Sequence, residues 1–562
     1  MSRTHKPPPL RSVFEPGTTR WAVRRAQWLA MGLSEADFHK PKIAVVNSSS
    51  KLSVCFAHLD DVAATVCEAV REAGAVPFEI RTVAPSDFVT SAGKQGRYLM
   101  PSRDLLVNDI EVQVEGAELD GMILLASCDK TTPGQLMAAA RLNIPSIVVP
   151  CGYQIGGQCG GRGVDIEDVY KAVGTVKAGR MGEDVLTDWT RHAIVGPGVC
   201  AGLGTANSMH IMAEALGMTL PGAAPVRAGS ERMWAMARAA GEAIVALLQA
   251  GVRPRDVMTQ TAFRNAVRVA CAVGVSVNCV RHLTAVAAEG EVDVDVIETF
   301  RTVGEETPLL CTVRPNGPER IEALEVAGGA RAVMAALAPV MEDAPTVAGS
   351  SMLARLDGIA PPTGVIRPLS SPARGEPGLV LLRGSLAPIG CIVKLAGVPS
   401  DVRRFEGPAR VFEDERQAID ALGNGSVRPG DVVVLRMLGP IGGPGTVFAA
   451  SFMAALVGAG LGDDVAVVTD GELSGLNRGI TVGQVMPEAA EGGPLALVEE
   501  DDTIAIHINE RRIDLLVDET VIAARQTAWS PPPPTEERGW LAQYGSLVRP
   551  LAEGAVLRAK RP

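Results

Sequence analysis

The tripeptide Cys128-Asp129-Lys130 combines a thiol, a carboxylate and an amine. It follows the apolar run 122–125, which predicts a buried strand. It precedes an expected helix that runs through 135–142, with Thr132 as its N-cap and Pro133 as its first residue. A second apolar run at 147–149 completes a βαβ unit. Ligands of open α/β sheets bind at the carboxyl ends of strands. At this point a thiolate could hold a soft metal, a carboxylate a hard metal and an amine an anion.

Two further cysteines occupy loops of the same kind. Cys55 lies between the apolar run 43–46 and an expected helix at 59–73, and Cys200 precedes an expected helix at 210–216. Helix starts favour thiolate over thiol because the helix dipole and the free N–H groups stabilise the anion. Three thiolates can hold an iron–sulfur cluster and leave one iron open. Zinc is the competing metal, but its closed structural sites prefer short ligand spacings.

The composition excludes several classes of protein. The 562 residues, 47% of them hydrophobic, leave room for two or three domains with large cores. The net charge of −11 argues against a nucleic-acid surface, and the absence of an eighteen-residue apolar run argues against a membrane span. The ten cysteines lack short paired spacings, which favours reduced thiols over disulfides. We therefore expect a soluble cytoplasmic protein with no nucleic-acid or membrane partner.

The pattern of apolar runs predicts two domains. Strand-like and helical runs alternate over residues 42–340, which indicates a parallel sheet covered by helices. Residues 343–378 are rich in Pro, Gly and Ser and indicate a boundary. We expect an N-terminal α/β domain over residues 1–360 and a smaller β-rich domain over residues 375–562. An expected hairpin over residues 504–517 belongs to the second domain.

The segments around the three cysteines resemble the dihydroxy-acid and sugar-acid dehydratases (the IlvD/Edd family). The resemblance spans nearly the whole chain, with further ordered matches at residues 100–103, 358–368, 382–388, 439–445, 469–475 and 487–494. It implies a hydro-lyase that dehydrates a 2,3-dihydroxy carboxylic acid to a 2-keto acid. It also implies that the second domain is a β-barrel-like swivelling module similar to one in aconitase, and that the protein is a homodimer or a dimer of dimers.

The resemblance also implies roles for individual residues. It makes Cys55, Cys128 and Cys200 the ligands of an iron–sulfur cluster, either [2Fe–2S] or [4Fe–4S], and the cysteine at position 55 favours [2Fe–2S]. The open iron would take the departing hydroxyl group. The resemblance implies that Asp87, Asp129 and a carbamylated Lys130 are ligands of Mg²⁺. It also implies that Ser474 is the base. Without the resemblance, Lys130 would be interpreted as a partner of the substrate carboxylate.

Several positions depart from the family pattern at the expected site. A glutamate that usually ligates Mg²⁺ is replaced by Phe448, and the usual Arg-Phe of the serine turn is Glu472-Leu473. Leu438 replaces the usual acidic residue before Gly-Pro, and Phe88 replaces the glycine of the usual Asp-Gly pair. The usual Gly-Gly-Pro-Met loop is Cys151 to Gln154. Either Glu472 supplies the missing carboxylate for an altered substrate, or the divalent site is weakened. We favour a working dehydratase with a shifted substrate.

Three functions therefore compete. The leading hypothesis is a dihydroxy-acid dehydratase whose substrate has an apolar tail, which Leu136, Ile155 and Phe448 would suit better than a polyol. A sugar-acid (aldonate) dehydratase is the alternative within the same class. A non-catalytic iron–sulfur paralogue with a degraded Mg²⁺ site is the alternative from another class. An NADH-dependent enzyme is disfavoured because the glycines of residues 156–161 lack a strand–turn–helix context.

The lost glutamate gives a direct prediction. Substitution Phe448→Glu should tighten Mg²⁺ binding, because it restores an oxygen ligand of the kind that Mg²⁺ prefers. A Mg²⁺ titration of the purified protein and of the variant measures this. An unchanged titration would show that position 448 does not face the divalent site.

Overall fold

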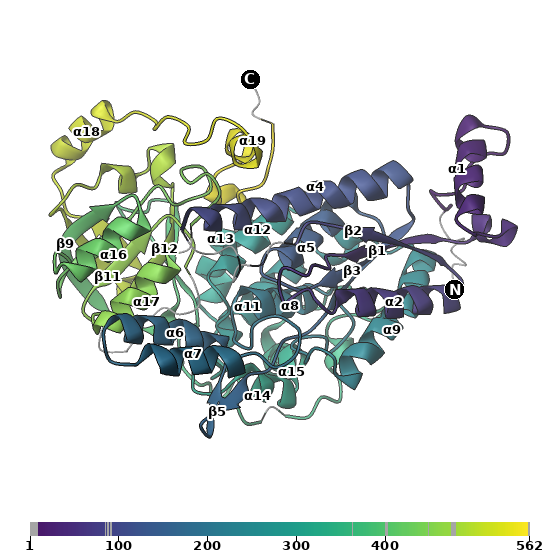
Figure 1. Cartoon of the computed structure of the whole chain (residues 1–562), viewed down its shortest axis with the longest axis horizontal. Helices are drawn as coiled ribbons and strands as arrows, with labels where there is room; N and C mark the ends of the chain where they lie inside the picture. The colour runs from purple at the N-terminus through teal and green to yellow at the C-terminus, as the bar shows by residue number, and fades with distance from the viewer. Residues whose placement is uncertain are drawn as a thin grey trace.

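The structure is a computed structural model that describes residues 9–84, 86, 89, 93–361, 363–398, 403–447, 449–473 and 479–559. Two regions lie side by side in Figure 1. The first, coloured purple to teal, is an α/β region with a four-stranded sheet. The second, coloured green to yellow, contains an eight-stranded sheet. This arrangement confirms the predicted fold class.

The first sheet is parallel, with strand order β2-β1-β3-β4. Its strands are β1 (Lys42–Asn47), β2 (Val76–Arg81), β3 (Gly121–Ala126) and β4 (Ser146–Pro150). Every residue of β1, β3 and β4 is buried, as expected for a parallel sheet that is covered on both faces. Helices α2 (Leu59–Glu72) and α9 (Glu231–Ala250) contact the sheet and each other, and α5 (Thr131–Leu142) packs with α4 (Leu99–Ala117).

Two details of the expected helices are wrong. Helix α5 begins at Thr131, and its N-cap is Lys130, with no capping side chain. Thr132 instead donates its hydroxyl to the carbonyls of Ser127 and Cys128, which ties the helix start to the preceding loop. Helix α8 (Thr205–Ala215) begins five residues before the expected helix at 210–216. It therefore starts directly after the loop that carries Cys200.

The expected alternation of strands and helices also stops after β4. The rest of the first region is mostly helical, interrupted by a short hairpin of β5 (Gly157–Cys159) and β6 (Arg162–Val164). No helix within the described ranges is long and apolar enough to span a bilayer. The other helices of this region are α1 (Thr19–Ala30), α6 (Ile166–Lys177), α7 (Glu183–His192), α10 (Pro254–Val257), α11 (Gln260–Val273), α12 (Asn278–Gly290), α13 (Val296–Thr299), α14 (Ile321–Val326) and α15 (Gly329–Leu337).

The second sheet has strand order β14-β13-β9-β10-β11-β12-β8-β7 and is nearly closed. A bridge between Arg383, next to β7, and Arg512, in β14, links its two edges. The expected hairpin forms, as β13 and β14, but the central strands β9 to β12 are parallel, which the apolar pattern did not predict. The strands are β7 (Val380–Leu382), β8 (Gly390–Val393), β9 (Arg404–Phe412), β10 (Val432–Leu435), β11 (Ala466–Thr469), β12 (Thr481–Met486), β13 (Thr503–His507) and β14 (Arg512–Leu515).

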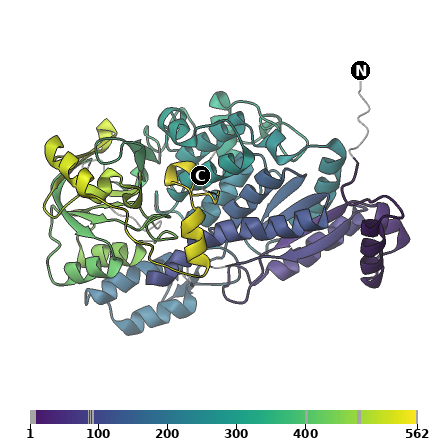
Figure 2. The ribbon, with the colours of Figure 1, turned by 90° about the horizontal axis from the view of Figure 1, so that it is seen from above.

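Four helices complete the second region: α16 (Glu415–Gly423), α17 (Ala450–Ala459), α18 (Glu519–Ala528) and α19 (Trp540–Leu547). Helices α16 and α17 contact each other, and α16 contacts β9 and β10. Helix α19 contacts α4 of the first region, which Figure 2 shows from above. The C-terminal segment therefore crosses back over the α/β region.

Two glycines allow α6 of the first region to pack closely against α17 of the second. A Cβ atom on Gly174 would overlap the carbonyl oxygen of Ala454, and one on Gly458 would overlap the backbone of Gly174. Below α17 in Figure 1, α6 lies against the second region, and α7 packs against α6. The backbone of one helix thus fills the space that a side chain of the other would need.

This helix crossing gives a stability prediction. Substitution Gly174→Ala should lower the free energy of unfolding by about 1–3 kcal/mol, because the added methyl group overpacks the contact. Gly116→Ala in α4 is the matched control, since a Cβ there meets nothing within 4 Å and alanine favours a helix. Denaturant titration of both variants measures the difference. Equal stability of the two variants would contradict the close crossing.

Candidate active site between the two regions

The first sheet has its topological switch point between β1 and β3. These strands are parallel neighbours, and β2 and β4 lie on opposite sides of the pair. Cys55 lies in the loop after β1, and Cys128 follows β3. A crevice outside the carboxyl ends of the strands at such a point is the usual ligand site of an open α/β sheet. The topology thus brings two of the candidate ligands together.

The thiols of Cys55 and Cys128 are hydrogen-bonded to each other. This hydrogen bond is the largest cause that lowers the pKa of Cys55 to about 7, against the opposing effect of burial. Thiolates are the form of cysteine that binds metals. Elsewhere burial raises the thiol pKa, as it does for Cys67, Cys151, Cys271, Cys279, Cys311 and Cys391.

Hydrogen bonds join the loop of Cys200 to the other two loops. The backbone N–H of Gly198 donates to the carbonyl of Val54, next to Cys55. Asp129 is buried and accepts hydrogen bonds from Thr205 and Ala206, at the start of α8. Burial raises the pKa of this carboxyl, and the charge of Lys130 opposes that shift. The structure therefore brings together the three loops that carry the predicted cluster ligands.

The serine turn approaches this place from the second region. Asp470, which directly follows β11, accepts hydrogen bonds from the backbone N–H groups of Met437, Leu438 and Ala489. The backbone of Glu472 bonds to Val447 and Ala449, one residue to either side of position 448. The predicted base Ser474 and the predicted ligand Asp87 lie outside the described residues, as does Phe448.

Glu472 meets two cations of the first region. The Lys130 ammonium donates to both carboxylate oxygens of Glu472, at 2.7 and 3.0 Å. The Arg281 guanidinium forms an ion pair with the same carboxylate. All three side chains are at most 1% exposed. Buried charges need such partners, because their removal from water costs several kcal/mol per ion.

Further groups support this ion-pair network from behind. His282 lies 3.4 Å from the Lys130 ammonium and 3.3 Å from the Arg103 guanidinium. Burial and these neighbouring cations lower the pKa of His282 well below its usual value. Arg103 also donates to the carbonyls of Gly554 and Ala555, near the end of the chain. The match at residues 100–103 thus serves to fix the C-terminal segment.

Sequence reasoning missed Arg281, His282 and Lys394. Arg281 and His282 lie on α12, where two basic side chains stand in an otherwise largely apolar run. Both are nevertheless buried, and Lys394 is buried at the end of β8. A basic residue inside an apolar run was the available signal. Their partners could not be identified without the fold, because those partners come from distant segments.

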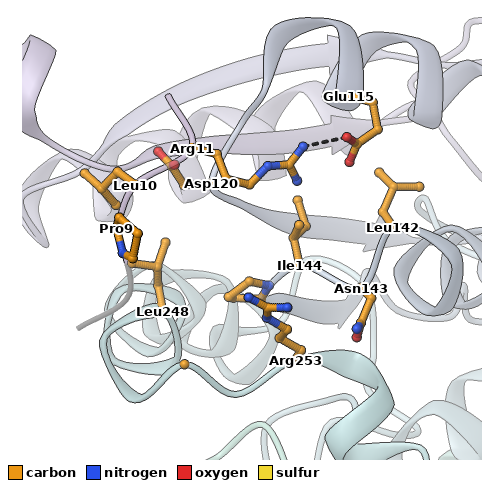
Figure 3. A pocket seen from close by; sticks show the side chains of 12 residues that line it. Pro9, Leu10, Arg11, Glu115, Asp120, Leu142, Asn143, Ile144, Leu248 and Arg253 are labelled. Carbon is orange, nitrogen blue, oxygen red and sulfur yellow. Dashed lines mark hydrogen bonds and ion pairs between the residues drawn. The ribbon is translucent and has the colours of Figure 1, made fainter. Parts of the chain in front are cut away.

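Two other features do not include any of the three predicted cluster ligands. A cavity of about 330 Å³ lies at the amino ends of β3 and β4, opposite the switch point, and Figure 3 shows its lining side chains, among them Arg11 and Asp120. Cys159 of β5 lies with Asp188 and His192 of α7, their ligand atoms within 4.8 Å of one another.

The fold and the site together define an α/β protein with a barrel-like second domain. Thiols, carboxylates and cations lie buried near the contact between the two regions. Comparisons with known proteins are more specific. The protein-family model described as dihydroxy-acid/6-phosphogluconate dehydratase N-terminal matches residues 40–355. The corresponding C-terminal family model matches residues 364–555. The chain therefore belongs to the dihydroxy-acid/6-phosphogluconate dehydratase family, which makes it an enzyme of the hydro-lyase class.

Individual relatives match over nearly their full length. The chain is 40% identical to a dihydroxy-acid dehydratase of Syntrophobacter fumaroxidans over 96% of this chain and 98% of that protein. It is 42% identical to one of Moorella thermoacetica over 95% and 98%. It is 40% identical to one of Pyrococcus abyssi over 97% and 99%.

The buried ion pairs give a second stability prediction. Substitution Glu472→Gln should lower the free energy of unfolding by about 3–5 kcal/mol, because Lys130 and Arg281 are left buried without a counter-charge. Glu298→Gln, which removes the half-exposed partner of Arg301, should cost less than about 1 kcal/mol. Denaturant titration of both variants is the measurement. Small and similar losses in the two would contradict the buried network.

Proposed function

We propose that this enzyme dehydrates a 2,3-dihydroxy carboxylic acid to a 2-keto acid, as a dihydroxy-acid dehydratase. The single observation that carries the proposal is the contact between the thiols of Cys55 and Cys128 at the switch point. The names of the full-length relatives support this substrate class. The proposed cluster ligands are Cys55, Cys128 and Cys200, and their donor set suits an iron–sulfur cluster with one open iron.

The reaction has two difficult parts. Removal of the proton on C2 builds negative charge beside a carboxylate, and hydroxide is a poor leaving group at C3. When bound, the cluster supplies a Lewis acid for the departing hydroxyl group. The C2–H bond breaks, its electrons form the C2–C3 double bond, and the hydroxyl group takes up a proton and leaves as water. The resulting enol then tautomerises to the 2-keto acid.

Ser474 is the proposed base for the C2 proton. A serine acts as a base only when a neighbouring cation or oriented donors stabilise its alkoxide. The cations Lys130 and Arg281 bind Glu472, two positions before this serine. Asn278 donates to the carbonyl of Leu473 and so holds the residue that precedes it. Both contacts favour the assignment of the base to this turn.

We also propose Asp87, Asp129, Lys130 and Glu472 as ligands of Mg²⁺. Mg²⁺ takes oxygen ligands, and an ammonium group cannot bind it. In the described structure the Lys130 ammonium donates to Glu472, so these side chains fit Mg²⁺ only once Lys130 carries a carbamate. No step of the proposed reaction depends on this ion. The homodimer likewise stays a prediction from the resemblance.

Turnover under anaerobic conditions with Mg²⁺ tests the function. We expect a 2-keto acid from 2,3-dihydroxyisovalerate and little or none from an aldonate. Serine variants of Cys55, Cys128 and Cys200 should lose bound iron, sulfide and turnover by at least about tenfold, since each removes a metal ligand. Cys391→Ser, in the core of the second sheet, is the matched control.

The alternatives predict different results in the same assay. Preferential turnover of the aldonate would identify a sugar-acid dehydratase. A bound cluster without turnover of either substrate would favour a non-catalytic iron–sulfur paralogue. Iron content that is unchanged in the three cysteine variants would contradict the proposed cluster ligands.

A further inference from the structure

Lys394 follows strand β8 and is 6% exposed, and its ammonium nitrogen has no hydrogen-bond partner among the described residues. Buried polar groups of folded proteins are nearly always hydrogen-bonded. Lys42, another buried lysine, illustrates the usual situation, because its ammonium donates to the carbonyls of Phe38 and Lys40. The unsatisfied ammonium of Lys394 is therefore a feature that needs a partner.

The negative charge that acts most strongly on Lys394 is that of Glu167, on α6, which also forms an ion pair with Lys171 at 3.8 Å. Its Oε2 atom likewise has no hydrogen-bond partner within the described part of the chain. The Glu167 side chain lies against Gly202, in the loop of Cys200, where a Cβ atom would overlap it. Burial lowers the pKa of Lys394 to about 8, and Glu167 opposes that shift. Lys394 thus carries a weakly solvated charge close to the Cys200 loop.

Two observations place Lys394 near the candidate active site. Burial raises the pKa of Cys279 on α12, and the charges of Lys394 and Lys130 lower it. The preceding residue, Val393, pairs with Val482 of β12, the strand that follows the serine turn. Lys394 therefore lies near the Cys200 loop and α12, beside the strand pair β8–β12 that adjoins the serine turn.

We propose that the Lys394 ammonium binds the carboxylate of the hydroxy-acid substrate, a role that rests on the proposed function. An unsatisfied buried ammonium offers up to three donors, and hydrogen bonds between charged groups are roughly twice as strong as neutral ones. An ammonium on the substrate carboxylate also stabilises the negative charge that grows at C2 as its proton leaves. Glu167 balances the lysine while no anion is bound.

Calorimetric titration of the iron-loaded enzyme with 2-ketoisovalerate, a product of the proposed reaction, tests this role. At pH 6.5, where the ammonium is charged, Lys394→Met should weaken binding by about ten- to a hundredfold, because one charged hydrogen-bonding group is lost. Lys394→Arg should recover part of the affinity. Glu167→Gln should tighten binding, because it removes a competing carboxylate. Lys42→Met is the control. Lys42 begins β1, at the end of the strand away from the Cys55 loop, so this substitution should leave binding unchanged.

The two partners thus have opposite predicted effects, which a purely structural ion pair would not produce. Unchanged binding in Lys394→Met, with normal iron content, would overturn the proposal. Equal weakening in Lys394→Met and Glu167→Gln would also overturn it. If Lys394→Met loses iron, Glu167→Gln and Lys394→Arg decide the question. Tighter binding of the keto acid by Glu167→Gln would support the role of Lys394, and weaker binding would refute it. Failure of the proposed function would appear separately, as a lack of turnover while keto-acid binding still depends on Lys394.

Discussion

The buried contact of Lys130 and Arg281 with Glu472 joins the two regions of the molecule at the place where the candidate active site lies. Each of these charges would cost several kcal/mol to bury alone, so the three are stable only together. Because Glu472 comes from the second region and both cations from the first, the contact fixes how the regions meet. It also fixes the turn that precedes Ser474.

The thiols depend on a different constraint, the topology of the first sheet. Strands β1 and β3 are parallel neighbours, so their following loops meet at one edge. The hydrogen bond from the Ser127 hydroxyl to the carbonyl of Cys55 holds these two loops together. Buried apolar strands thus present polar loops whose positions vary little. That rigidity suits a site in which several ligands must share one metal centre.

The departures from the family pattern are related through charge. The resemblance implies an arginine in the serine turn, where this chain has Glu472. Arg281 of α12 forms an ion pair with that glutamate. The turn therefore carries an acidic residue where the family pattern has a basic one, and its counter-charge comes from the first region.

The sequence by itself determined the fold class, most strands and the family, because apolar periodicity and ordered motifs are local signals. It also predicted Cys55, Cys128 and Glu472 as site residues, although not that Glu472 meets Lys130. Only the tertiary structure decided which distant groups meet, as for Arg281, His282 and Lys394. Whether a basic side chain is buried, paired or unsatisfied depends on segments far away in the chain. Local sequence patterns do not indicate those partners, because the partners come close only when the chain folds.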